Sequence, residues 1–319
     1  MTSCNLTKTF FILGFLLVTL VGCQPSAPTL QERALPYPFD DKATQYQIAL
    51  PDCNPKGTLL LMAGFGQTAQ QVMQETPLVQ KAAEEGLACV VLPIGYHLWL
   101  DSAFHQHLEK NLEAIRTLHN VPFEKGVVLG GFSAGGTMAM CYAELRLRFA
   151  ESPSFPINGV FLVDSPLDLA ALHAYCIQEL EQGIYADAIQ EARFIKNMLE
   201  SQLGGTPKEI PEIYAEFSPY TLSPSLDNHS ALFSAIPLRS YHDADEDWYQ
   251  EERGRTIQET HLPVAQHLVA TLRAMGNEDA EIIIATGKGY RADGTRHPHS
   301  WSIVDAEECL AWAKRCLNN

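Results

Sequence analysis

The sequence predicts an α/β fold: a mainly parallel sheet of about seven or eight strands with helices on both faces. Short apolar runs alternate with longer segments in which apolar residues recur every three or four positions, and this alternation is typical of parallel strands joined by helical crossovers. The run 87–92 is apolar throughout, as expected of a strand covered on both faces. With 319 residues, 46% of them hydrophobic, the chain can bury one large core.

Each element follows from its local pattern. Besides the run before Gly131, strands are expected at residues 46–50, 58–62, 87–92, 158–163, 236–241 and 280–286. Helices are expected at residues 69–85 with an interruption at Pro77, 101–119, 137–149, 167–182, 184–203, 208–217, 262–275 and 304–317. About seventy residues separate two successive strands near the middle of the chain, far more than an ordinary crossover contains. We therefore expect a helical cap, inserted at about 167–235, over the site. A peripheral packing insertion is the alternative.

The stretch around Ser133 carries the clearest functional signal. Apolar residues lead into a G-x-S-x-G pattern formed by Gly131, Ser133 and Gly135, and a helix-compatible run follows. Strand, sharp turn and helix in this order form a nucleophile elbow, which exposes the serine hydroxyl. The glycines lack Cβ atoms, so strand and helix can approach closely around a strained serine. A glycine-rich turn without a catalytic role is the alternative. A phosphate-binding loop is disfavoured because no Gly-Lys-Ser/Thr follows.

Over most of the mature chain the sequence resembles the α/β-hydrolase family, and more narrowly its esterase-like lipoproteins. The resemblance rests on the elbow, on the glycine-containing loop 63–67 and on a late histidine loop. It implies that the loop 63–67 supplies one backbone N–H of an oxyanion hole, with Phe65 as the expected donor and Gly66 as the second choice. Ala134, which follows the nucleophile, would supply the other N–H. Ala63 stands where the family usually has histidine, and a turn with no catalytic part is the alternative.

A reactive serine needs a base, normally histidine, and an acid that orients the imidazole. In the family these follow the serine in the order acid, then histidine, with the histidine after the last strand. His297 and His299 both follow the last expected strand. Ser300 and Trp301 resemble the segment that follows the family's base, so we expect His299 to be the base. His297 is the second choice, and two surface histidines without a catalytic role are the remaining alternative.

Aspartates alternate at the end of a late strand, at residues 243, 245 and 247. The family's strand-end pattern, apolar-His-Gly-x-x-Asp, assigns the acid to Asp245 when it is aligned with this segment. His242 departs from the pattern, because it stands where glycine is usual. Asp247 is the second choice for the acid. Asp164, after the preceding strand, is a further alternative that is disfavoured by chain order.

Residues 1–22 resemble a lipoprotein signal peptide. Lys8 precedes an apolar run of about a dozen residues, which is too short to span a bilayer. The run ends at Leu-Val-Gly-Cys23, which resembles a bacterial lipobox, so we expect Cys23 to carry lipid. Residues 23–44 contain four prolines and are expected to form a lipid-anchored tether before a hydrolase domain at 45–319. The expected location is the bacterial cell envelope, facing the periplasm or at the outer membrane. The alternative is an ordinary signal peptide with a chance cysteine.

Composition excludes several classes of partner. The formal net charge is −16 and no basic cluster is present, which argues against nucleic acid and against electrostatic attraction to anionic lipid. We expect a membrane partner only through the N-terminal lipid. Neither C-x-x-C nor H-E-x-x-H occurs, so we expect no metal and no cofactor. A zinc hydrolase that uses His297 and His299 as ligands is the rival mechanism. The sequence leaves the oligomeric state open.

The expected function is that of a serine hydrolase of class EC 3.1.1, which cleaves carboxylic esters of a small acyl compound. Ser133, Asp245 and His299 would form the triad, and the reaction would pass through an acyl-enzyme intermediate. The preference for esters follows from the resemblance alone. The alternatives are a peptidase or acyl transferase with the same triad, and a non-catalytic binding lipoprotein of the envelope.

Overall fold

The structure is a computed structural model. It describes residues 29–34, 45–149, 155–223, 225–226 and 230–318. The predicted signal peptide and Cys23 lie outside the described residues. Within the described ranges, no helix has both the length and the apolar character that crossing a membrane requires.

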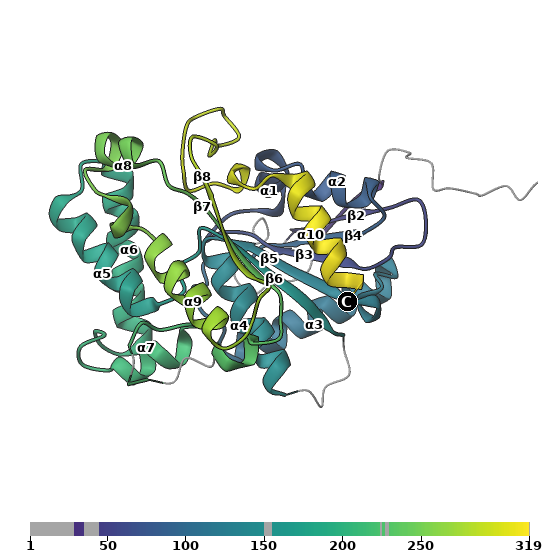
Figure 1. The fold of residues 1–319 in the computed structure, drawn as a ribbon, viewed down its shortest axis with the longest axis horizontal. Coiled ribbons are helices and arrows are strands. Elements are labelled where there is room, and N and C mark those ends of the chain that lie inside the picture. Colours follow the sequence, from purple (N-terminus) through teal and green to yellow (C-terminus); the bar gives the residue numbers. More distant parts are fainter. Residues whose placement is uncertain (1–28, 35–44, 150–154, 224, 227–229, 319) are drawn as a thin grey trace, which may run out of the picture.

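One eight-stranded sheet forms the centre of the molecule (Figure 1). Its strands follow the order β1-β2-β4-β3-β5-β6-β7-β8. The strands β1 and β2 and the strands β2 and β4 pair antiparallel, and all the other pairs are parallel. The bounds of the strands are β1 Thr29–Ala34, β2 Gln45–Leu50, β3 Thr58–Met62, β4 Ala88–Leu92, β5 Val127–Phe132, β6 Ile157–Val163, β7 Leu238–Asp243 and β8 Ala280–Ala285. This topology confirms the predicted fold class.

Helices cover both faces of the sheet and create two apolar cores. Side chains alternate across the sheet, so Leu60 packs in one core while Leu59 and Leu61 pack in the other. The first core includes residues of α3, α4 and α9, and the second includes residues of α1, α2 and α10. The bounds of these helices are α1 Ala69–Glu75, α2 Leu78–Glu84, α3 Ser102–His119, α4 Ala134–Arg148, α9 Leu262–Ala274 and α10 Ala306–Asn318.

Three helices are inserted between β6 and β7, as the sequence predicted. They are α5 (Leu169–Gln182), α6 (Ala186–Leu203) and α7 (Pro211–Phe217). They lie together at one side of the sheet in Figure 1. The Asp168 side chain caps α5, because its carboxylate accepts the N–H groups of the first turn. Residues 164–168 connect the end of β6 to the first inserted helix.

Two elements differ from the sequence-based expectation. Residues 29–34, assigned to the tether, form β1 and pair with β2. Residues 246–253, for which no helix is expected, form α8 (Glu246–Arg253). Only Tyr249 is buried in α8, so apolar periodicity, the main sequence signal for a helix, is missing there. An N-terminal cap and tertiary contacts determine this helix instead.

Candidate active site

Ser133 lies in a sharp turn between β5 and α4. Its backbone has φ 54° and ψ −128°, a conformation that is strained for a residue with a Cβ atom. The turn requires its glycines, because a Cβ on Gly131 would lie 2.2 Å from the backbone of Gly135. A Cβ on Gly135 would lie 2.2 Å from the carbonyl oxygen of Met62. The predicted strand, strained serine and helix are therefore all present, and the serine lies at the N-terminus of α4.

The loop after β3 reaches the same place. Phe65 and Ala134 line one cavity together with Ser133. In the described part of the chain, neither the Phe65 N–H nor the Ala134 N–H donates to a protein acceptor. The Gly66 N–H, by contrast, donates to the carbonyl oxygen of Gly95 at 2.8 Å. The geometry favours Phe65 over Gly66 as the oxyanion-hole donor, because only free N–H groups can bind a developing oxyanion.

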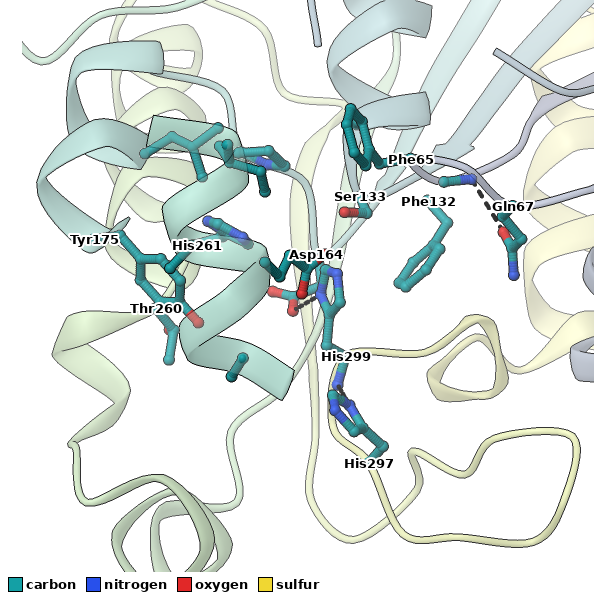
Figure 2. Close-up of a pocket in the computed structure, with 18 of the residues that line it drawn as sticks. Phe65, Gln67, Phe132, Ser133, Asp164, Tyr175, Thr260, His261, His297 and His299 are labelled. Atoms are coloured by element: carbon teal, nitrogen blue, oxygen red, sulfur yellow. Dashed lines mark hydrogen bonds and ion pairs between the residues drawn. The ribbon is translucent and has the colours of Figure 1, made fainter. Parts of the chain in front are cut away.

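His299 lies beside the serine in this cavity (Figure 2). It follows β8 in a long loop, and its ring packs against Phe132 with the ring centroids 4.6 Å apart. The Nδ1 atom of His299 lies 2.6 Å from Oδ2 of Asp164. A carboxylate at this position holds the imidazole in the tautomer with its proton on Nδ1, which leaves Nε2 free to accept a proton. His299 therefore has the partner that a general base requires.

The partner of His299 is Asp164 and not the predicted Asp245. Asp164 follows β6 directly, is buried, and has a positive φ of 44°. Burial acts to raise the pKa of its carboxyl group, but hydrogen bonds from His242 and His299 outweigh burial and hold that pKa well below its usual value. Asp164 is thus an ionised carboxylate at neutral pH.

Both carboxylate oxygens of Asp245 are used away from His299. Its Oδ1 accepts the Trp248 N–H at 3.2 Å and caps α8, and its Oδ2 accepts from Nη2 of Arg296 at 2.6 Å. The hydrogen bond from Arg296, opposed by partial burial, lowers the pKa of Asp245. The second choice, Asp247, is exposed in the first turn of α8. The structure thus corrects the prediction that Asp245 is the triad acid, because Asp245 caps α8 and pairs with Arg296.

The remaining aspartate of this cluster, Asp243, holds the histidine loop in place. Its carboxylate accepts the backbone N–H groups of Gly287, Lys288 and Gly289 at 3.0, 2.9 and 2.8 Å. Nη2 of Arg296 lies 2.9 Å from the same carboxylate. These contacts connect the end of β7 to the loop that carries His299. The sequence marks this strand end as important, but it does not distinguish a loop anchor from a triad acid.

Gln67 was not singled out in the sequence, yet it joins the two loops around the serine. Its Oε1 accepts the Gly64 N–H at 3.0 Å and the indole N–H of Trp301 at 3.0 Å (Figure 2 draws the first contact). Trp301 is fully buried in the short helix η4 (Trp301–Ile303), shortly after His299. No local pattern indicates this role, because the two partners are far apart along the chain.

The cavity has a volume of about 360 Å³ and is closed on one side by the inserted helices. The helix α5 contributes Tyr175 and Glu179, and α6 contributes Glu191 and Ile195. The size suits a small-molecule ligand. Residues of the insertion therefore line the same cavity as Ser133.

Two further histidines line the cavity without a carboxylate partner among the described contacts. Burial lowers the pKa of His297 to about 3 and that of His261 to about 4. The Nδ1 atom of His297 accepts the backbone N–H of His299 at 3.2 Å. The Nε2 atom of His297 lies 3.1 Å from Nη2 of Arg253, so both of its ring nitrogens have partners, and His299, which contacts Asp164, remains the candidate base. In the described ranges, no three His, Cys, Asp or Glu side chains are grouped so that they could hold a metal ion.

Comparison with known proteins gives the fold. The sequence matches no family model and no curated protein. MPT51 (FbpC1) of Mycobacterium tuberculosis is similar in structure, with a TM-score of 0.55 and 12% identity over 91% of this chain and 98% of that chain. FphF, a fluorophosphonate-binding serine hydrolase of Staphylococcus aureus, is similar with a TM-score of 0.52 and 14% identity over 92% of this chain and 100% of that chain. Carboxyl esterase 2 of Tuber melanosporum is similar with a TM-score of 0.54 and 15% identity over 94% of this chain and 86% of that chain. The chain therefore has the α/β-hydrolase fold.

Proposed function

We propose that this protein is a serine hydrolase that cleaves carboxylic esters through an acyl-enzyme intermediate, with Ser133 as nucleophile, His299 as base and Asp164 as acid. The observation that carries the proposal is the contact of 2.6 Å between His299 and Asp164 in the cavity that Ser133 lines. The fold alone does not determine the chemistry. The similarity to proteins described as a serine hydrolase and a carboxyl esterase adds support.

The first half of the reaction forms the acyl-enzyme. Oγ of Ser133 attacks the ester carbonyl carbon while Nε2 of His299 takes the hydroxyl proton. The carbonyl oxygen becomes an oxyanion, and the N–H groups of Phe65 and Ala134 bind it. Each such donor lowers the barrier by roughly 3–4 kcal/mol. When the intermediate collapses, the bond to the leaving alkoxide breaks, and His299 returns its proton to that oxygen.

The second half releases the acid. His299 takes a proton from water, whose oxygen attacks the acyl carbon, and the N–H groups of Phe65 and Ala134 again bind the oxyanion. The bond to Oγ of Ser133 then breaks, and His299 gives the proton back to the serine. Asp164 remains ionised throughout and stabilises each imidazolium. The inserted helices line one side of the cavity, and a site from which water is excluded strengthens such electrostatic interactions.

Labelling with a fluorophosphonate tests the proposal together with ester turnover. The wild type should form a covalent adduct and hydrolyse p-nitrophenyl butyrate. Ser133→Ala should do neither, and it should keep the unfolding midpoint of the wild type, because the hydroxyl accepts no structural hydrogen bond among the described residues. Ester hydrolysis that survives in Ser133→Ala would refute the assignment of the nucleophile.

We also propose that lipid on Cys23 attaches the protein to the bacterial cell envelope, facing the periplasm or at the outer membrane. The support is the sequence around Cys23 alone. Cys23→Ala should move the protein from the membrane fraction to the soluble fraction of cells. Unchanged fractionation would contradict lipidation.

A further inference from the structure

A second histidine contacts the carboxylate that holds His299. The Nδ1 atom of His242 lies 2.8 Å from Oδ1 of Asp164, while Nδ1 of His299 lies 2.6 Å from Oδ2. Each oxygen of the carboxylate therefore faces one imidazole. A Ser-His-Asp triad needs only one of these contacts, so the contact with His242 requires a separate explanation.

The surroundings of His242 fix the orientation of its ring. The residue is 2% exposed, and its Nε2 atom lies 2.8 Å from the hydroxyl of Ser240, which is 1% exposed. An ionised carboxylate only accepts hydrogen bonds, so Nδ1 of His242 carries the proton that reaches Asp164. Nε2 is the ring nitrogen that faces the Ser240 hydroxyl. Every polar group in the row Ser240, His242, Asp164 and His299 thus has a suitable partner, and the row ends at the base.

The backbone conformation of Asp164 places its carboxylate between the two imidazoles. Its φ of 44° is in the left-handed region, and such a conformation costs about 1–3 kcal/mol in a residue other than glycine. The Asp164 N–H donates to the carbonyl oxygen of Tyr241 at 2.9 Å, next to His242 in β7. The strained residue is thus attached to the strand that carries His242, and its carboxylate lies between the two imidazoles.

Other ionisable groups surround this row from each neighbouring element. They are Asp243 at the end of β7, Tyr175 of α5, Tyr249 of α8, Arg253 and Arg255 at and after the end of α8, His261 at the start of α9, and Arg296 and His297 in the histidine loop. Among them, His261 and His297 are neutral at pH 7, since burial lowers the pKa of each. Burial also raises the pKa of Tyr175. Within the described residues, His242 and His299 are the groups whose hydrogen bonds reach the carboxylate of Asp164.

We propose that His242 is a positioning residue that fixes the orientation of Asp164 and draws off part of its negative charge, so that His242 sets how tightly His299 holds a proton. This inference rests on the proposed function only in so far as His299 acts as the base. The physical basis is general: a hydrogen-bond donor to a carboxylate stabilises its charged form and makes it a weaker proton acceptor. By donating to Asp164, His242 weakens the electrostatic attraction between that carboxylate and the imidazolium of His299.

The consequence of removing the donor has a definite sign. Without His242, Oδ1 of Asp164 has no donor in the described structure, and the whole negative charge acts on His299. The imidazolium is then held more strongly, so a higher pH is needed to free the base. The acid limb of the pH profile of kcat/KM should move to higher pH. The maximal rate should also fall, because the carboxylate loses the contact that fixes its rotation.

Three variants in β7 separate positioning from simple packing. In His242→Leu, the acid limb of kcat/KM for p-nitrophenyl butyrate should move up by about half a pH unit or more, and kcat should fall about tenfold to a hundredfold. In His242→Asn, the amide nitrogen can take the place of Nδ1, so both properties should return most of the way to the wild type. Tyr241→Phe is the matched control: it removes a buried hydroxyl of the same strand that contacts Arg239 and Glu308, and it should leave the acid limb in place.

Proton NMR does not require turnover, so it tests the proposal even in a variant with low activity. In the proton NMR spectrum, the wild type should show hydrogen-bonded ring protons from both His242 and His299. In His242→Leu one signal should disappear, and the His299 signal should move downfield because its partner is a stronger acceptor. If the His299 signal and the acid limb both stay in place, or if His242→Leu and His242→Asn lose activity equally with no change in the limb, the proposal is overturned. If the wild type fails to react with fluorophosphonate, the proposed function is refuted, while the NMR result still decides the role of His242.

Discussion

The carboxylate of Asp164 lies 2.6 Å from Nδ1 of His299, although 135 positions separate the two residues in the sequence. Asp164 directly follows β6, and His299 belongs to the loop after β8. Because the parallel strands β6, β7 and β8 are neighbours, their carboxyl ends lie at one edge of the sheet. The strand order therefore brings an acid from one strand end to a histidine that follows another.

Replacing the two candidate acids should give opposite results. Asp164→Asn removes the charge that stabilises the imidazolium and disturbs the tautomer of His299, so kcat for an ester should fall by about 10⁴. Asp245→Asn should change kcat less than about tenfold, since asparagine can still cap α8. Steady-state kinetics on one ester with both variants measures the difference. A larger loss in Asp245→Asn than in Asp164→Asn would return the acid to Asp245.

Gln67 should support the oxyanion loop. Gln67→Met leaves the N–H of Gly64 and the indole N–H of Trp301 without their acceptor, and each buried unsatisfied donor costs about 1–3 kcal/mol. We expect a lower unfolding midpoint and a decrease of about tenfold in kcat/KM. The matched control is Gln70→Met, the same substitution at an exposed position of α1. Equal effects of the two substitutions would show that Gln67 has no special role.

Acid should destabilise the protein partly through His261. Its pKa is about 4 in the folded chain, because burial opposes charging, against an ordinary value of 6.5. Between pH 6.5 and 4 the unfolded chain binds a proton that the folded chain does not, so the free energy of unfolding falls as pH falls through this window. His261→Gln should reduce that fall by about 1–3 kcal/mol. Denaturant unfolding of both proteins across the window provides the measurement, and identical pH slopes would contradict the expectation.

A buried ion pair should hold the inserted helices to the rest of the chain. Glu179 of α5 pairs with Arg255, which follows α8, and the two side chains are only 2% and 4% exposed. Removal of either charge leaves the other buried and unpaired, so Glu179→Gln and Arg255→Met should each destabilise the protein by about 3–5 kcal/mol. The double variant should lose less than the sum of the two. Chemical unfolding measures all three variants.

The control for this pair is an exposed pair of the same kind. Arg116 and Glu113 form an ion pair on the surface of α3, where both side chains are about half exposed. Arg116→Met should leave the unfolding midpoint unchanged, because water already solvates both charges. Additive losses in Glu179→Gln, Arg255→Met and their double variant would show that the buried pair does not act as a unit.

The sequence alone was sufficient for the features that local patterns specify. The α/β fold, the strained turn at Ser133, the break at Pro77 and the three inserted helices follow from apolar periodicity and from the positions of glycine and proline. The placement of His299 after the last strand also follows from chain order. The helix α8 was missed because its residues are mostly polar and only Tyr249 is buried.

The partner of His299 was decided only by the tertiary structure. Asp164, Asp243 and Asp245 all lie near strand ends, and a local pattern cannot show which carboxylate reaches the imidazole. The carboxylate of Asp243 accepts three backbone N–H groups. The carboxylate of Asp245 contacts Arg296 and the N-terminus of α8. The carboxylate of Asp164 faces His299 and His242. Apart from the cap of α8 by Asp245, each of these contacts joins residues that are distant in sequence. Which aspartate contacts His299 is therefore a property of the folded chain, because it depends on distances that only the assembled sheet and loops define.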